Sequence, residues 1–563
     1  MNKIIVVLMT VLIPVSVFSQ ISVSKKDKEK IPNNWYQLDA STGYYGISLE
    51  KAYTLIKSKN LKSNRILVAV IDSGIDTLHE DLKPVLWTNP KEVPGNGIDD
   101  DHNGYVDDIH GWNFLGNKDG RNVSEDSYEA ARVYYSLRTK WGGKTIEEDD
   151  LNKADREEYR TFLKAEEKTM GADKTPDVPL TMLKRIQENL NKSDSILKIA
   201  MDKQVFMIED LEVFKPQNSD DAKAKNTLLS MMKADNSPDQ TNREFIMGLN
   251  DYVSGEVKKE EARRNPPEEY RKEVVGDNEN DLNDRFYGNN DVMASTPFHG
   301  THCSGLIAAV RNNDKGIDGV ADNVRIMMLR AVPDGDEHDK DIANAIRYAV
   351  DNGAKIISMS FGKDFSPKKE WVDDAFRYAE TKGVLLVQAA GNDAHNIDNE
   401  SNFPSPIYKD GKGRATNIIT VGASGNMKNG GLTATFSNYG KDRVDVFAPG
   451  VGIYSTIPGG NTYGNSSGTS FSCPIVAGVA ALLLEYFPSL SPQQLKYVIE
   501  KSATAPAEKV FIPGTDDKVS LSELSKTGGI VNAYEAVKLA ETLKTETPKT
   551  ILPKPKMKKT KLG

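Results

Sequence analysis

The sequence predicts an α/β fold built on a doubly wound, mostly parallel sheet with helices on both faces. In residues 61–115 and 289–540, short apolar runs alternate with Gly-rich turns and amphipathic stretches, as is typical of a parallel sheet. Residues 116–288 are instead rich in Lys and Glu and carry few strand signals. We therefore expect a discontinuous α/β domain, residues 20–115 and 289–540, with a mainly helical unit inserted at 116–288.

Each expected strand is a short apolar run followed by a turn. These runs cover residues 66–71, 324–332, 355–360 and 384–390. Amphipathic stretches at 340–352 and 367–382 predict helices, and another helix is expected to begin at Ser470. In the insertion, helical spacing is carried by Leu183, Ile186, Leu190, Ile196 and Leu197.

Both ends of the chain differ from the α/β domain. Lys3 precedes a short apolar run, and Val17 and Ser19 fit a signal-peptidase site, so residues 1–19 are predicted to be a signal peptide that directs export. A retained membrane anchor is the alternative, and no later segment is expected to span a bilayer. Residues 541–563 are basic and contain Pro-Lys repeats, which predicts a disordered tail.

The composition limits the classes of partner and the means of stabilisation. The chain has 72 Lys and Arg against 81 Asp and Glu, a formal charge of −9, which does not favour nucleic acid. Only two cysteines occur, Cys303 and Cys473, so an exported chain would lack a disulfide framework. We expect both to be buried free thiols, with a disulfide as the alternative. No organic cofactor is expected, and the oligomeric state is left open.

The seven histidines restrict the chemistry that the chain can perform. No His-Glu-x-x-His occurs, which excludes the commonest zinc peptidase motif. Asp72-Ser73-Gly74 has no second copy, whereas an aspartic protease needs two facing carboxylates. Ser466 lies in an esterase-like Gly-x-Ser-x-Gly pattern, but that triad needs a later histidine and none follows His395. The remaining possibility is a catalytic triad whose residues occur along the chain in the order Asp, His, Ser.

Four sequence blocks contain the Asp, His and Ser in this order, together with one further polar residue, Asn392. They read VIDSGID from residue 70, HGTHCSG from 299, AAGN from 389 and GTSFSCP from 468. Together they resemble the subtilisin family of serine proteases over residues 33–115 and 289–540. The resemblance implies a bacterial secreted hydrolase, a serine endopeptidase that cleaves peptides or proteins, with a large insertion between the Asp and His blocks.

The resemblance also assigns a role to each block. It makes Asp72 the residue that orients the imidazole, His299 the general base and Ser470 the nucleophile of an acyl-enzyme mechanism. Asn392 matches the side-chain donor to the oxyanion, and a turn residue after Gly391 is the alternative. Two positions fit this chemistry on physical grounds. Asp72 ends a parallel strand, where α/β sheets bind ligands, and Ser470 precedes an apolar helix whose N-terminus favours negative charge.

Two further features near these blocks have competing interpretations. His302 is interpreted as a core histidine, because the family's base matches His299. Ser360-Phe361-Gly362 resembles the substrate-binding segment, to which the peptide backbone would pair together with Gly391. Phe361 is alternatively a core residue.

Two acidic features predict structural calcium. The segment 99–108 places oxygen ligands at alternate positions before a Gly turn and then adds further carboxylates. The candidate ligands in it are Asp99, Asp101, Asn103, Asp107 and Asp108. A solvated acidic loop is the alternative. Separately, Asp81 and Asn313 match calcium-ligand positions of the subtilisin family.

The insertion and the catalytic state each leave an alternative open. Asp72 and His299 must meet, although they are 299 − 72 = 227 positions apart. Both stems of the insertion are therefore expected near the site, so the insertion either roofs the site or faces outward to bind a partner or to dimerise. The alternative to an active peptidase is a catalytically silent binding or chaperone-like protein on the same fold. The presence of residues competent for every catalytic role favours the peptidase.

Overall fold

The computed structural model describes residues 31–171, 179–234 and 241–545. The predicted signal peptide lies outside the described residues, as does the predicted tail from residue 546 onward. Residues 541–545, which were also expected in the tail, instead continue helix α15 (Ala533–Thr545). The physical reason is that Ala540 and Leu543 of α15 still pack in the main core.

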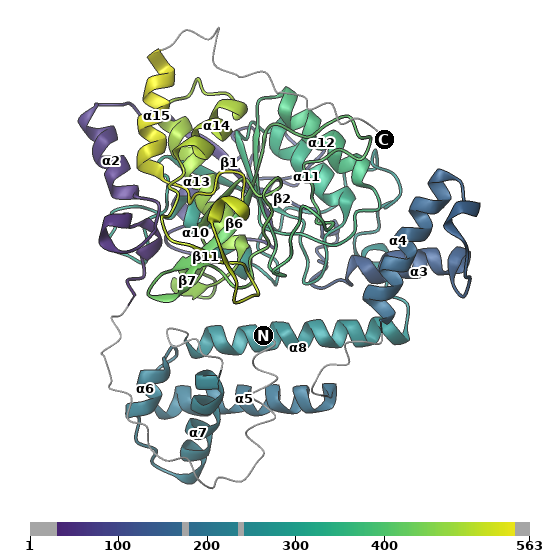
Figure 1. Ribbon diagram of the computed structural model, residues 1–563, viewed down its shortest axis with the longest axis horizontal. Helices are drawn as coiled ribbons and strands as arrows, with labels where there is room; N and C mark the ends of the chain where they lie inside the picture. The colour runs from purple at the N-terminus through teal and green to yellow at the C-terminus, as the bar shows by residue number, and fades with distance from the viewer. Residues whose placement is uncertain (1–30, 172–178, 235–240, 546–563) are drawn as a thin grey trace.

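An eight-stranded sheet forms the centre of the α/β domain (Figure 1), in the strand order β2-β3-β1-β4-β5-β6-β7 with β8 paired to β6. The pairings are parallel except that β7 runs antiparallel to β6. The strands are β1 (Ile66–Asp72), β2 (Gly111–Asn113), β3 (Val324–Arg330), β4 (Ile356–Met359), β5 (Leu385–Ala389), β6 (Ile418–Asn426), β7 (Asn429–Thr433) and β8 (Val446–Pro449). The predicted α/β fold class is confirmed.

Helices cover both faces of this sheet, and each face has its own core. Val68 and Val70 face the first core, which includes residues of α10 and α13, whereas Ala69 and Ile71 face the second core with α11 and α12. Because both faces are buried, β1 is a continuous apolar run. These helices are α2 (Leu49–Ser58), α10 (Phe298–Ala308), α11 (Asp339–Asp351), α12 (Lys369–Thr381), α13 (Thr469–Tyr486) and α14 (Pro492–Ser502).

Two small hairpins complete the α/β domain. Strands β9 (Ile453–Ile457) and β10 (Thr462–Ser466) pair antiparallel, as do β11 (Val510–Phe511) and β12 (Lys518–Val519). The β9–β10 hairpin leads directly into α13, so it lies beside the start of that helix.

Helix α13 corrects one expectation about membranes. Among the described residues it is long and apolar enough to cross a bilayer, whereas no segment after residue 19 was expected to be. However, 94% of its apolar window is buried inside the protein. Its apolar character is explained by its central position in the first core, where both its sides are covered.

Over its described residues the insertion is helical and contains two separate small cores. Its helices are α3 (Glu129–Trp141), α4 (Lys153–Met170), α5 (Leu180–Ala200), α6 (Ile208–Val213), α7 (Ser219–Ala234), α8 (Asn242–Arg264) and α9 (Tyr270–Val274). Helices α3 and α4 pack together with Phe365 of the α/β domain, and α5 to α8 form the other core. The apolar Val123, Val275 and Tyr287 belong to the second core of the α/β domain. The separate helical part therefore begins and ends inside the expected limits of 116 and 288.

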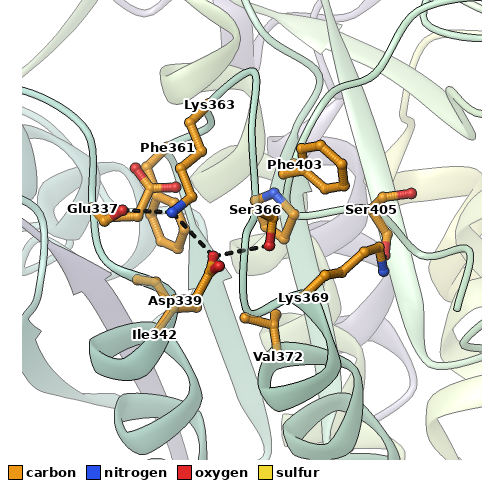
Figure 2. Close-up of a pocket in the computed structure, with 11 residues that line it drawn as sticks. Glu337, Asp339, Ile342, Phe361, Lys363, Ser366, Lys369, Val372, Phe403 and Ser405 are labelled. Atoms are coloured by element: carbon orange, nitrogen blue, oxygen red, sulfur yellow. Dashed lines mark hydrogen bonds and ion pairs between the residues drawn. The ribbon is translucent and has the colours of Figure 1, made fainter. Parts of the chain in front are cut away.

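A buried ion network joins α3 to the α/β domain. The Lys363 ammonium lies 2.7 Å from Glu129 Oε2. It also lies 3.0 Å from Asp339 Oδ1 and donates to the Glu337 carbonyl at 2.7 Å (Figure 2). Arg132 adds a second cation 2.8 Å from Glu129. Although burial alone would raise the pKa of Glu129, the charges of Arg132 and Lys363 hold it far below its usual range. The network thus contains compensated buried charges that join the insertion to the domain.

Lys363→Met should lower the free energy of unfolding by about 3–5 kcal/mol, because it leaves Glu129 and Asp339 buried without their shared cation. Urea denaturation at about pH 7 measures this change. Lys272→Met is the matched control: Lys272 pairs with Glu269 at 2.8 Å, but the two side chains are 78% and 68% exposed. Its loss should cost less than about 1 kcal/mol.

The difference in the free energy of unfolding between Lys363→Met and the wild type should also become smaller in acid. The folded-state pKa of Glu129 lies below its unfolded value, so the stabilising contribution of Glu129 is full above that unfolded value and is lost as the pH falls toward the folded pKa. Denaturation at about pH 7 and about pH 3 compares the two regimes. An equal difference at both pH values would contradict this account of the network.

Candidate active site

Asp72 and His299 meet at the carboxyl end of β1. Asp72 is the last residue of this central strand and is 2% exposed, and His299 lies in the first turn of α10. His299 Nδ1 is 2.8 Å from Asp72 Oδ1 and 3.0 Å from Oδ2. A carboxylate can only accept, so Nδ1 donates and Nε2 is left to accept a proton.

The Asp72 carboxylate stabilises the positively charged form of the His299 imidazole. Burial alone would lower the pKa of the His299 imidazole, but the negative charge of the Asp72 carboxylate holds this pKa well above its usual value. The imidazole side chain is nevertheless 34% exposed, so solvent and ligands can reach it. The arrangement therefore stabilises the imidazolium that forms when His299 takes a proton.

Ser470 lies beside this pair, in the first turn of α13. Its Oγ donates to the Ser360 carbonyl at 3.1 Å, and Ser360 Oγ donates to the Ser470 carbonyl at 2.8 Å. Ser470 Oγ is thus bonded to Ser360 and not to His299 in this structure. Catalytic hydrogen bonds often align only when substrate is bound, so the partner of Ser470 here is compatible with a role as nucleophile.

Asn392 is held next to Ser470 by hydrogen bonds to the residue before it. Its Oδ1 accepts from the Thr469 backbone N–H at 2.9 Å and from the Thr469 hydroxyl at 3.0 Å. Among the described residues, its Nδ2 has no hydrogen-bond partner. The preceding Gly391 has φ +102°, and a Cβ there would lie 2.3 Å from Asn438 Nδ2. Only glycine fits that position, and the exposed Asn392 that follows it is thereby held beside Thr469, the residue before Ser470.

His302 lies one turn after His299 but contacts different groups. Its ring is buried 4.4 Å from the Phe471 ring, and Nε2 lies 3.2 Å from the Gly464 carbonyl. Burial, together with the nearby His299, lowers the pKa of His302 to about 3. Its hydrogen bond therefore joins β10 to α10, and it is Asp72 and His299 that form the carboxylate–imidazole pair.

Both cysteines are free and buried beneath the site. Cys303 Sγ is 3.8 Å from His299 Nδ1, and burial raises the pKa of this thiol. Cys473 Sγ lies 3.2 Å from the Val387 carbonyl, and burial raises the pKa of its thiol to about 12. Neither is a thiolate at neutral pH, so neither has the reactive form of a nucleophile.

The segment 360–362 follows β4 and passes between Ser470 and a small pocket. Phe361 lines that pocket and also packs against the second core, as the alternative interpretation expected (Figure 2). A Cβ on Gly362 would lie 3.1 Å from the Phe403 carbonyl, so a side chain there would be crowded. The next residue, Lys363, pairs with Phe403 through two backbone hydrogen bonds of 2.9 and 3.0 Å. Gly362 is thereby fixed at the edge of the site.

The acidic segment 99–108 is rearranged relative to the predicted ligand set. Carboxylate oxygens of Glu92, Asp99 and Asp101 lie within 4.8 Å of one another. Asp107 is instead directed at the backbone N–H groups of residues 95 and 97, which its two oxygens accept at 2.7 and 2.8 Å. Asp107 is thus not part of this cluster, because its oxygens hold the turn.

Asp108 and Asn103 also have other partners. Asp108 accepts from Asn89 at 2.7 Å, from Asn103 at 3.0 Å and from the Tyr348 hydroxyl. Burial raises the pKa of Asp108 to about 6. Glu92 was missed because it lies seven positions before the motif, and only the folded loop brings it to Asp99.

Asp81 and Asn313 meet although 232 positions separate them. Asn313 Nδ2 donates to Asp81 Oδ1 at 2.5 Å, and the Tyr463 hydroxyl donates to Oδ2 at 2.8 Å. The two predicted residues thus lie together, and the sequence contained no signal for Tyr463 as a third member.

Comparison with known proteins gives a family for this arrangement. The sequence profile of the Subtilase family, Peptidase_S8, matches residues 63–528. The chain is 39% identical over 240 residues to a thermophilic serine proteinase of Bacillus sp. strain AK1, a match that covers 42% of this chain and 52% of the relative. It is 37% identical over 253 residues to thermitase of Thermoactinomyces vulgaris, covering 45% of this chain and 79% of thermitase.

A third relative is the cell wall-associated protease of Bacillus subtilis strain 168, which is 32% identical over 275 residues, or 46% of this chain and 28% of the relative. The chain thus spans only part of the length of each of these relatives. The family profile nevertheless extends over most of the chain and over all four motif blocks. The chain belongs to the subtilase family of serine-type endopeptidases, as these blocks predict.

Proposed function

We propose that the protein is an active serine endopeptidase that cleaves peptide bonds through Asp72, His299 and Ser470. The supporting observation is the hydrogen bond from His299 Nδ1 to Asp72 at 2.8 Å, with Ser470 at the start of the neighbouring helix α13. This geometry leaves Nε2 of His299 available as a base. A catalytically silent binding protein would not need an oriented, solvent-accessible imidazole beside a serine hydroxyl.

The reaction begins when the Ser470 hydroxyl gives up its hydrogen bond to the Ser360 carbonyl and donates to His299 Nε2 instead. His299 takes the hydroxyl proton as Oγ bonds to the substrate carbonyl carbon, and the negative charge moves to the carbonyl oxygen. Asn392 Nδ2 and the N-terminus of α13 donate to that oxygen. His299 then protonates the leaving amine, and water, activated by the same imidazole, hydrolyses the acyl-enzyme.

Peptides or proteins are the proposed substrates, bound through the backbone of Ser360 to Gly362 and beside Gly391. An extended substrate can pair with such a segment as an added strand. Export of the protein is proposed as well, since one relative is named a cell wall-associated protease.

Structural calcium is proposed at two places. Glu92, Asp99 and Asp101 would supply carboxylate oxygens at one. Asp81 would supply them at the other, where Asn313 now donates its amide N–H to Asp81 and would have to turn its amide oxygen toward the ion. The first set fits the ion's chemistry, because three carboxylates within 4.8 Å repel one another unless a cation lies between them. The ion would hold the loop and take no part in bond cleavage.

Ser470→Ala and His299→Ala should each abolish turnover, and to a similar extent, because base and nucleophile act as one unit. His302→Ala is the matched control, since its ring packs on Phe471 and does not reach Asp72. It should lower the melting temperature but keep kcat within about tenfold of wild type. Casein hydrolysis measures the turnover of each variant, and labelling by a serine-directed inhibitor measures the reactivity of its serine. Activity in His299→Ala with none in His302→Ala would reverse the assignment.

Asn392→Asp and Asn392→Ala should lower kcat by about 100- to 1,000-fold with little change in KM, a range that comes from subtilisin itself and not from this structure. Asn392→Asp keeps the acceptor for the Thr469 N–H, so the loop stays in place while the donor is lost. Steady-state kinetics on a short chromogenic peptide separate kcat from KM. A similar kcat in all three proteins would mean that Asn392 is only a turn residue.

Chelation of calcium should lower the melting temperature by about 5 °C or more, because the ion binds only the folded loop. The double variant Asp99→Asn/Asp101→Asn should lose the part of this sensitivity that comes from the first site. Asp100→Asn is the control, since Asp100 accepts from the Val93 N–H at 2.9 Å and is not in the cluster. Unchanged melting under chelation, with no calcium detected by elemental analysis, would reject both sites.

A further inference from the structure

Helix α8 of the insertion lies between the α/β domain and helices α5 to α7 (Figure 1). One face of α8 is apolar and packs in the core of that helical group. Its residues there are Phe245, Ile246, Leu249 and Val253. The opposite face carries Glu244, Gly248, Asp251, Gly255 and Lys258, whose spacings of four and three place them on one side of a helix. This second face is directed at the α/β domain.

The two ends of α8 are attached to different parts of the α/β domain. Near its start, Arg243 donates to the Pro458 carbonyl at 3.3 Å, just after β9, and Glu244 interacts with Asn465 of β10. Near its end, Lys258 forms an ion pair with Asp334 at 3.0 Å and also donates to the Asp334 carbonyl. The rise of a helix places Glu244 and Lys258 about 21 Å apart.

These two attachment points lie on either side of the catalytic residues. Asn465 is five positions before Ser470, and Asp334 follows β3, whose neighbour β1 ends at Asp72. Midway between them on α8 lies Asp251; burial and Asp334 raise the pKa of this carboxyl, and the charge of His299 opposes that rise. Helix α8 therefore crosses from β10 to the segment after β3 on the side of the α/β domain that carries His299.

The crossing leaves space at the middle of α8. A Cβ built on Gly248 meets no atom within 4 Å, so the helix does not press on the α/β domain there. His299 correspondingly keeps 34% of its side-chain surface exposed. A glycine inside a helix costs stability relative to alanine, and here it leaves the middle of α8 without a side chain.

We propose that α8 is a strap across the catalytic site, so that a substrate reaches Ser470 only as a single extended chain passing between Gly248 and His299. The inference rests on the proposed peptidase activity and adds the class of substrate: unfolded polypeptide that can enter beneath α8 by a free end. A peptide loop held at both ends by a folded domain is excluded, because the domain cannot pass between the two attachments.

The test compares one peptide sequence in two forms, as a free linear peptide and as a surface loop inserted into a stably folded domain. The wild-type enzyme should cleave the loop at least about 100-fold more slowly than the free peptide. Arg243→Ala/Lys258→Ala, which removes one attachment at each end of α8, should raise cleavage of the loop about tenfold and change cleavage of the free peptide by less than about twofold. Lys259→Ala is the matched control, since Lys259 pairs with Glu256 within α8.

A second variant works in the opposite direction and does not require detachment. Gly248→Leu should narrow the opening and lower kcat/KM for the free peptide about tenfold, while a small sulfonyl fluoride still labels Ser470 at the wild-type rate. Gly248→Ala adds a methyl group that meets nothing within 4 Å, so its peptide turnover should match the wild type. The melting temperatures of both variants report whether the helix is intact.

Two results would overturn the inference, and they are distinguishable. If the wild type cleaves loop and free peptide at similar rates, or if neither set of variants changes their ratio, the strap is wrong although the peptidase stands. If no form of the enzyme hydrolyses the free peptide and Ser470 is not labelled, the proposed activity itself fails and the strap fails with it.

Discussion

The hydrogen bond between His299 and Asp72 is the constraint on which the rest of the arrangement depends. It joins the end of β1 to the start of α10, two segments 227 positions apart in the chain. The insertion between them must therefore leave and return at neighbouring points. Asn113 of β2 and Asn289 do lie side by side, joined by two backbone hydrogen bonds of 2.9 and 3.1 Å. Since loop-closure entropy grows slowly with length, a large unit can be held between such stems at modest cost.

The insertion is attached to the domain by charge as well as by apolar packing. The Lys363 network lies inside the protein, where each charge has lost its water and depends on the others. Such a network adds little net stability, but it gives α3 one position relative to the domain. Lys258 and Asp334 are different, because Asp334 is 61% exposed and their attraction is screened by solvent. The attachment of α8 is thus the weaker of the two.

Ser470 and Asn392 illustrate how the site is organised before substrate binds. In the proposed mechanism the Asn392 donor needs no rearrangement when negative charge develops, because Thr469 already orients this side chain. Ser470, by contrast, would have to change one hydrogen bond before it could act as the nucleophile. A single side-chain rotation is a small cost beside the stabilisation that fixed dipoles give the transition state.

Much of the fold and the central residues of the site could be read from the sequence, because those signals are local. Buried parallel strands are continuous apolar runs such as 66–71, and the motif residues lie at strand ends and helix starts regardless of what surrounds them. The order of Asp, His and Ser along the chain also reduced the possible catalytic triads to one type.

Tertiary structure alone decided which polar groups became neighbours. Glu92 joined Asp99 and Asp101, while Asp107 turned to the backbone of its own loop. The direction of α8 could not be predicted from the sequence either. Its apolar face indicates that one side of the helix is buried, but it does not indicate which part of the protein covers that side. Contacts such as those of Lys258 and Asp334 depend on where distant segments are brought together, and that is fixed by the packing of the whole chain.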